Sequence, residues 1–305
     1  MIKSLIIGGL AIAFLGWLFT ACSGNKTSNV TAAKPRIAVS IPPQMFFVRN
    51  IAGDRVDITC LLNSSADPET FEPSVALFRE LAEADAFLAL GTLPFEKKIV
   101  ANLTGNSKEP AIYYVNKDIE ALRGTHSHHD SHVGHHDENE SDNADPHIWS
   151  SVKNARIIAL NTLDALVAAD PKNEDTYRAN FARLESRIDS IDSLFIRNVV
   201  NNADAPKSFV VWHPSLSYFA RDYNLKQLPL SHAGKESSVK GFADRLQKIK
   251  DNGTNIFFFQ KEFDTDKAHT IARDADIKLI EINPMNEEWE DEIQKLYDAF
   301  TINKP

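Results

Sequence analysis

Four short segments of the chain place a potential metal ligand beside a proline. Glu69 lies in the segment DPETFEP, His147 in DPHIW and His213 in VWHP. The fourth segment, INPM, contributes Asn283, which offers only an amide carbonyl. Imidazole and carboxylate groups bind zinc and related transition metals, whereas an amide carbonyl is a poorer ligand. Taken alone, each segment would more often be a turn or a structural hydrogen bond than a metal site.

A second group of histidines lies in the polar stretch 125–142. It contains six of the ten histidines of the chain: His126, His128, His129, His132, His135 and His136. The stretch has almost no apolar residue to bury, so we expect a loop that is disordered without metal. Its internal position and irregular spacing argue against a purification tag. Exposed imidazoles titrate near pH ~6.5 and are mostly neutral at pH 7. We therefore expect a low-affinity collector or sensor of zinc, with a merely solvated loop as the alternative.

The pattern of β-rich and helical runs predicts an α/β fold. Strands are expected at 37–41, 56–62, 86–90 and 111–115, and again at 208–212, 225–230, 255–259 and 278–282. Helices are expected at 42–52, 74–84 and 94–103, and at 215–223, 238–251, 266–275 and 287–300. Such alternation predicts two βα lobes, each with a mostly parallel sheet. Ligands of such sheets bind beyond the carboxyl ends of the strands, so we expect a binding cleft between the lobes.

A long helix is expected to join the two lobes. Asp170 and Pro171 resemble a helix start, with a capping carboxylate before a proline. An apolar stripe at spacings of three and four follows, formed by Tyr177, Phe181, Leu184, Ile188, Ile191 and Phe195. We therefore expect a first lobe over 36–169, a rigid backbone helix over 170–204 and a second lobe over 205–305.

The first residues indicate export. Lys3 precedes an apolar run that is short for a membrane span and ends in small residues, which predicts a cleaved signal over 1–21. Cys22 follows directly and resembles a bacterial lipobox, which implies lipid attachment to its thiol. An ordinary signal peptide with an incidental cysteine is the alternative. The polar residues of 22–35 then form a tether.

The charge and the cysteine content of the chain limit the binding partners and the disulfides that can be expected. The formal net charge is −9 and no basic run follows the signal, so nucleic acid is excluded as a partner. Cys60 is the one other cysteine, so no intrachain disulfide is expected with Cys22 lipidated. Its β-rich surroundings predict a small buried side chain rather than a reactive thiol.

From about residue 36 to its end, the chain resembles the zinc and manganese solute-binding proteins of bacterial ABC importers, the ZnuA/TroA type of metal-binding lipoprotein. The DPHIW segment is the most specific part of the resemblance, which also includes DPETFEP, the turn at Asn283 and residues 84–96 and 213–220. It implies one metal between two lobes, with two ligands from each. His147 and His213 match ligand positions of the family. Glu69 stands where the family usually has histidine, and Asn283 where it usually has aspartate.

The resemblance implies a monomeric, extracytoplasmic or periplasmic protein that is no enzyme and delivers its metal to a membrane permease. Zinc is expected over manganese because of His213 and the histidine-rich stretch, although Glu69 moves the site toward manganese. Water, Asn283 or a nearby glutamate (Glu262, Glu287 or Glu288) would complete the site.

Two other functions fit the residues. Glu69, His147 and His213 could hold a hydrolytic zinc with an open position, although no His-Glu-X-X-His motif supports this. Alternatively, the two substituted ligand positions could mark a relative with weakened metal binding that acts as an adhesin or chaperone.

Overall fold

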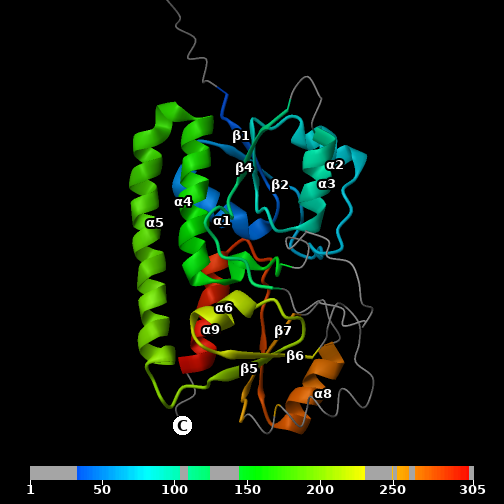
Figure 1. Ribbon diagram of the computed structural model, residues 1–305, viewed down its shortest axis with the longest axis vertical. Helices are drawn as coiled ribbons and strands as arrows, with labels where there is room; N and C mark the ends of the chain where they lie inside the picture. Colours follow the sequence, from blue (N-terminus) through cyan, green and yellow to red (C-terminus); the bar gives the residue numbers. More distant parts are fainter. Residues whose placement is uncertain are drawn as a thin grey trace, which may run out of the picture. The chain divides into compact units, whose positions relative to one another are not determined.

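Each half of the chain builds a four-stranded parallel sheet (Figure 1). The computed structural model describes residues 33–103, 109–123, 144–230, 249, 253–260 and 265–301. The first sheet has the order β2-β1-β3-β4, formed by β1 (Arg36–Val39), β2 (Asp57–Cys60), β3 (Ala86–Ala89) and β4 (Ala111–Tyr114). The second has the order β6-β5-β7-β8, formed by β5 (Ser208–Val211), β6 (Lys226–Pro229), β7 (Ile256–Phe259) and β8 (Lys278–Glu281). The predicted α/β fold with parallel sheets is confirmed.

The two sheets share one topology, and this fixes where ligands can bind. In each sheet, the first and third strands along the chain are neighbours: β1 beside β3, and β5 beside β7. From these two strands the chain continues toward opposite edges of the sheet, so the loops that follow them diverge. Such a switch point opens a crevice at the carboxyl edge of the sheet. His213 follows β5 and therefore lies at the switch point of the second sheet.

The helices largely match those expected. They are α1 (Pro42–Ala52), α2 (Val75–Leu81), α3 (Pro94–Leu103), α4 (Val152–Ala169), α5 (Glu174–Phe195), α6 (Ser217–Asp222), α8 (Thr265–Ala275) and α9 (Trp289–Thr301). The 3-10 turns η2 (Ile148–Ser150) and η3 (Pro171–Asn173) flank α4, and a π-helical turn, η4 (Ile196–Val200), extends α5. The helix expected over 238–251 lies outside the described residues except for Ile249.

The connection between the halves contains one helix more than we expected. The helix α4 precedes the predicted linking helix and packs along α5, so a pair of helices lies beside the sheets (Figure 1). Ser151 caps α4 by accepting a hydrogen bond from the backbone N–H of Asn154. Buried residues then recur at helical spacing, among them Ile158 and Leu166.

The predicted cap at Asp170 was wrong. The carboxylate of Asp170 makes no capping hydrogen bond to α5. Instead it accepts from the side-chain amide of Asn173 at 2.7 Å and from the hydroxyl of Tyr177 at 2.6 Å. These bonds hold the carboxyl pKa below its usual range, although burial acts to raise it. Asp170 therefore tightens the turn between α4 and α5 and fixes their pairing.

One hydrophobic core connects the two sheets. It contains Ile37 and Phe87 from the first sheet, Phe209 and Phe258 from the second, and Phe195 from α5, all buried. The apolar stripe predicted for α5 faces this core, with Phe181 and Ile191 only partly buried. A smaller core lies on the other face of the second sheet. A continuous core of this kind resists bending between the halves, because apolar contacts on both sides of any hinge would have to separate.

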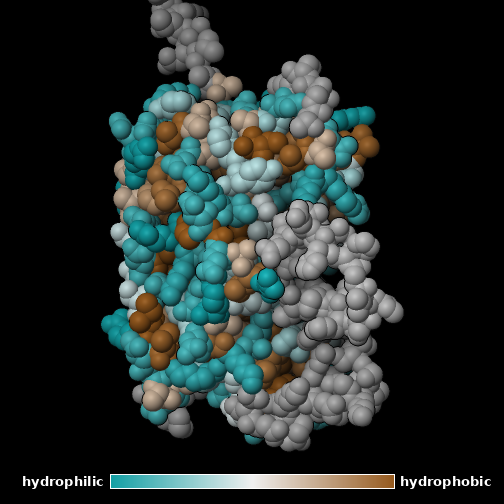
Figure 2. Space-filling model, viewed as in Figure 1, coloured by the Kyte–Doolittle hydropathy of each residue, from teal (hydrophilic) through white to brown (hydrophobic). Residues whose placement is uncertain are grey.

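The surface carries no concentration of large apolar side chains among the described residues. Those that are exposed come from four different elements: Val75, Tyr114, Leu160 and Ile196. Figure 2 shows apolar residues in separate patches between hydrophilic ones on the face viewed. In the described part of the chain, no helix combines the length and hydropathy that a membrane span needs.

The structure also describes Cys60 and the two residues that border the histidine-rich stretch. Cys60 ends β2, is half-buried rather than buried, and donates to the carbonyl of Leu62. Burial raises its thiol pKa to about 12, which disfavours the reactive thiolate. Arg123 and Ala144 form an isolated antiparallel bridge. The histidine-rich stretch between them, like Cys22, lies outside the described residues.

Candidate metal centre

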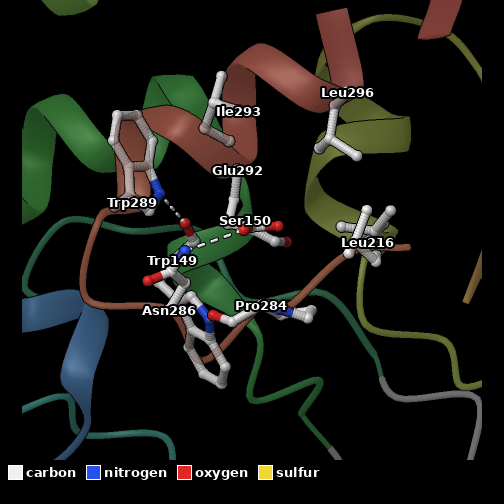
Figure 3. Close-up of a pocket in the computed structure, with 10 residues that line it drawn as sticks. Trp149, Ser150, Leu216, Pro284, Asn286, Trp289, Glu292, Ile293 and Leu296 are labelled. Atoms are coloured by element: carbon white, nitrogen blue, oxygen red, sulfur yellow. Dashed lines mark hydrogen bonds between the residues drawn. The ribbon is translucent and has the colours of Figure 1, made fainter. Parts of the chain in front are cut away.

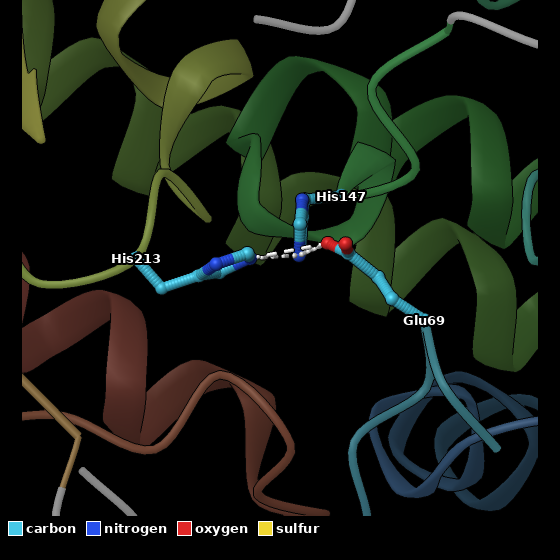
Figure 4. Close-up of side chains that lie close together, drawn as sticks. All are labelled: Glu69, His147 and His213. Atoms are coloured by element: carbon cyan, nitrogen blue, oxygen red, sulfur yellow. Dashed lines mark hydrogen bonds and ion pairs between the residues drawn. The ribbon is translucent and has the colours of Figure 1, made fainter. Parts of the chain in front are cut away.

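Three side chains meet at one point, as Figure 4 shows: Glu69, His147 and His213. Nε2 of His213 lies 3.1 Å from Oε1 of Glu69 and 3.3 Å from Nε2 of His147. Nε2 of His147 lies 3.3 Å from the same oxygen of Glu69. In a tetrahedral zinc site with bonds of about 2.0–2.1 Å, neighbouring ligand atoms lie about 3.3–3.4 Å apart. The three atoms therefore have the spacing of one face of a zinc tetrahedron.

His147 is oriented by Asp145. Its side chain is buried, and Nδ1 lies 2.8 Å from Oδ1 of Asp145, which also accepts from the backbone N–H of His147 at 2.9 Å. A carboxylate at Nδ1 holds the ring proton there and leaves the lone pair of Nε2 for a metal. Burial acts to lower the pKa of His147, but the hydrogen bond and charge of Asp145 outweigh it and raise that pKa.

Asp145 is itself buried, and the pKa of its carboxyl is lowered. Burial acts to raise this pKa, but the hydrogen bonds and charge of His147, with a hydrogen bond from Ser217, outweigh it. Asp145 therefore stays ionised and increases the basicity of the imidazole that faces the centre. We predicted no role for Asp145 from the sequence, although a carboxylate two residues before a metal-binding histidine is a signal for such a partner.

Glu69 comes from the loop that follows β2. The carboxylate of Asp67 accepts from the backbone N–H of Glu69 and from the hydroxyl of Thr70, both at 2.9 Å. Phe71 packs edge-on against Phe95 of α3, with ring centroids 5.2 Å apart. The hydrogen bonds to Asp67 stabilise the loop internally, and the packing of Phe71 on Phe95 attaches the loop to α3. Together these contacts position the Glu69 carboxylate.

The buried carboxylate of Glu96 stabilises the turn after β3, in the first half of the chain. Glu96 accepts from the backbone N–H groups of Leu90 at 2.6 Å and Gly91 at 2.7 Å, and from the hydroxyl of Ser40. Burial raises its pKa. Gly91 has φ +83°, and a side chain there would collide with Asn116, so the turn requires glycine.

The turn that Glu96 stabilises also makes a hydrogen bond to the segment that contains His147. Thr92 donates through its hydroxyl to the carbonyl of Pro146 at 2.8 Å. The residue before His147 is therefore tied to the loop after β3. We infer that Glu96 and Thr92 act on the centre only through this backbone.

Asn283 lies in a closed turn. Its side-chain oxygen accepts from the backbone N–H of Met285 at 3.0 Å, and its own N–H donates to Glu292 at 2.8 Å. Among the histidine, cysteine and acidic side chains of the described residues, the other three predicted ligands, Glu69, His147 and His213, come together at one point. Glu287 pairs with Arg49 at 3.1 Å. Glu288 is exposed, and Glu262 lies outside the described residues.

The chain matches a family model over residues 37–302, and that family is described as the periplasmic component A of the zinc-uptake complex, ZnuA. It belongs to the ZnuA family. The resemblance noted from the DPHIW and DPETFEP segments is thereby confirmed.

Two relatives illustrate the family. The zinc-binding protein AdcA of Streptococcus pyogenes serotype M3 is 25% identical over 313 residues, which cover 98% of this chain and 59% of AdcA. The high-affinity zinc uptake system protein ZnuA of Bacillus subtilis is 25% identical over 285 residues, which cover 91% of this chain and 88% of that protein. The chain thus spans somewhat more than half of the AdcA proteins it matches.

Solved structures agree with the fold. A crystal structure of ZnuA has a TM-score of 0.74 and 28% identity, covering 88% of this chain and 100% of that chain. Zn(II)-bound AdcA from Streptococcus pneumoniae has a TM-score of 0.70 and 23% identity, covering 90% of this chain and 59% of that chain. The ZnuA structure supports the two-lobe fold and the family together, and the AdcA structure supports the fold.

Removal of the Asp145 carboxylate should weaken zinc binding. We expect Asp145→Ala to cost about 10–100-fold in affinity, because the proton of His147 is then free to move to the nitrogen that faces the metal. Asp145→Asn keeps an acceptor oxygen and should lose less. Competition with a zinc-sensitive chelator measures both. Equal affinities for Asp145→Ala and the unmodified protein would exclude the orienting role.

Zinc affinity should fall as the pH is lowered. A proton and zinc compete for Nε2 of His147, whose pKa is raised above 6.5. The decline should therefore begin above pH 6.5 and reach about tenfold per pH unit for each proton displaced. Calorimetric titrations between pH 5 and pH 8, corrected for zinc hydrolysis and buffer binding, measure it. An affinity that is constant across this range would contradict the assignment of His147 as a ligand.

Proposed function

We propose that this protein binds one zinc ion outside the cytoplasm and delivers it to the permease of an ABC importer. The observation that carries the proposal is the convergence of Glu69, His147 and His213 at tetrahedral spacing from separate parts of the fold. Glu69 lies in the loop that follows β2 of the first sheet, His213 follows β5 of the second sheet, and His147 lies in the segment before α4. Membership of the ZnuA family supports the same function.

The ligand set favours zinc over manganese. Two nitrogens and one carboxylate suit zinc, whereas manganese prefers oxygen ligands in octahedral sites. The site carries one negative charge from Glu69, the same total as three histidines and one aspartate.

We infer that a water molecule is the fourth ligand of the zinc ion while the protein is not bound to its permease. The carbonyl oxygen of Asn283 already accepts a hydrogen bond from Met285, and the carboxylate of Glu287 is paired with Arg49. Substitution of Asn283 by aspartate would supply a second carboxylate and a stronger zinc ligand.

The proposal also includes export of the protein, a lipid anchor and a monomeric state. The apolar run before Cys22 supports export, and the lipobox supports a lipid anchor at that thiol. A relative named zinc-binding lipoprotein AdcA, from Streptococcus pneumoniae, supports this location. The separate apolar patches of the surface support a monomer. The histidine-rich stretch would bind further zinc ions weakly.

A zinc hydrolase remains the second candidate, because His₂Glu with an open position is also a catalytic ligand set. Zinc-loaded protein that hydrolyses activated esters, phosphates or peptides with turnover, beyond the rate of free zinc, would support it. A lack of stoichiometric metal after mild dialysis would instead favour an adhesin or chaperone.

Loss of either histidine should abolish tight zinc binding and leave the fold intact. His147→Ala and His213→Ala each remove one of two nitrogen ligands, and Glu69→Ala should weaken binding because it removes the only charge of the set. His269→Ala is the matched control, since His269 is exposed on α8. Calorimetry with zinc and circular dichroism measure the two properties. Unchanged affinity in both histidine variants would place the site elsewhere.

In competition at equal free concentrations, the protein should retain zinc rather than manganese. Glu69→His should strengthen the preference by adding a nitrogen, and Asn283→Asp should raise affinity for both metals. Elemental analysis after equilibrium dialysis measures the bound metals. Preferential retention of manganese by the unmodified protein would overturn the zinc assignment.

Deletion of residues 126–136 should remove weak zinc equivalents and keep one tight equivalent. The antiparallel bridge between Arg123 and Ala144 holds the two ends of this stretch together, so a shorter connection should leave the fold unchanged. Zinc titration followed by calorimetry separates the two classes of site. A deletion variant without the tight equivalent would show that the histidines belong to the main centre.

A further inference from the structure

The segment that carries His147 is held by residues of the second half, although it precedes α4 in the chain. Tyr218 of α6 donates its hydroxyl hydrogen to the carbonyl of Asp145 at 2.9 Å. The same hydroxyl oxygen accepts from the backbone N–H of Leu122 at 3.1 Å. Tyr218 is buried, and its hydroxyl thus links the backbone of Leu122 to that of Asp145, two residues before His147.

A second set of bonds holds the segment directly after His147. The indole N–H of Trp289 donates to the carbonyl of Trp149 at 2.7 Å, as Figure 3 shows. The indole of Trp149 in turn donates to the carbonyl of Pro284 at 2.8 Å. Both tryptophans are buried, and the ring of Trp149 lies 5.2 Å from that of His147. The two indoles therefore tie the His147 segment to the turn between β8 and α9.

The helix α6 adds two further polar contacts to the same segment. Asp222 pairs with the hydroxyl of Ser151, and Arg221 donates to the side chain of Asn154 at 3.3 Å. Since α6 follows the loop of His213, one element connects the surroundings of both histidines. Glu69 is held differently, by hydrogen bonds within its own loop and by packing on α3.

We propose that Tyr218 and Trp289 are positioning residues of the metal centre, which hold His147 and His213 as one preassembled pair that Glu69 completes. The inference rests on the metal centre proposed above. Tyr218 and Trp289 act on the backbone on either side of His147, so they set where its ring stands relative to His213. A pair held in this way loses little freedom when the metal binds, which slows release of the metal.

The chain provides a matched control for Tyr218. Tyr223 is equally buried and directly follows α6, and its hydroxyl donates to the carboxylate of Asp192 on α5 at 2.9 Å. Tyr218→Phe and Tyr223→Phe each remove one hydroxyl from a buried ring. The bonds of Tyr218 reach the His147 segment, whereas the bond of Tyr223 reaches α5.

The test compares the zinc dissociation rate, measured by stopped-flow mixing with an excess of chelator, with the thermal unfolding midpoint of the metal-free protein. Both variants should lower the midpoint, while Tyr218→Phe alone should raise the dissociation rate, by about tenfold or more. Equal dissociation rates in Tyr218→Phe and Tyr223→Phe would overturn the proposal.

Trp289→Phe provides a second route, because it keeps an aromatic ring against Phe46 and Phe47 and removes the indole N–H. It should also accelerate zinc release relative to Tyr223→Phe, and an unchanged rate would count against the proposal even if Tyr218→Phe does not fold. Unmodified protein that binds no stoichiometric zinc would refute the metal centre itself. Unmodified protein that binds one zinc, with variants that release it like the control, would refute only the positioning role.

Discussion

Two imidazole nitrogens and a carboxylate oxygen within 3.3 Å of one another bring their lone pairs together, which is unfavourable unless a cation or a proton lies among them. The fold must hold the three groups together in that arrangement. It does so with buried contacts from Asp145 at the ring of His147 and from Glu96 at the turn after β3, and with an exposed contact from Asp67 at the backbone of Glu69. A metal bound there would take the place of the proton among the three groups.

The continuous core explains why such an arrangement persists. Buried aromatic residues of both sheets pack on one another and on Phe195 of α5, for example Phe209 against Phe258 and Phe219. Because the sheets, α5 and α9 share this core, separation of the two halves would expose much apolar surface. The three side chains therefore meet in a frame that resists rearrangement.

Local pattern predicted the strands and singled out the segments of Glu69, His147 and His213, whereas the resemblance to a known family predicted that these residues share one site. Local pattern failed at α4, whose apolar face is mostly alanine, leucine and isoleucine without an obvious start, and at Asp170, whose carboxylate found tertiary partners instead of a helix end. The contacts of Tyr218 and Trp289 with the His147 segment span 73 and 140 residues. No local signal predicts contacts of that separation, so only the folded chain could supply them.

The antiparallel bridge between Arg123 and Ala144 has a consequence for how this chain can vary. When both ends of an insertion are already paired, lengthening it adds only loop-closure entropy, and each doubling of its length costs about 0.6 kcal/mol. Gains and losses of histidines between these two residues are therefore nearly invisible to the rest of the fold. Natural variation can therefore change the number of histidines in this stretch without altering the arrangement of Glu69, His147 and His213.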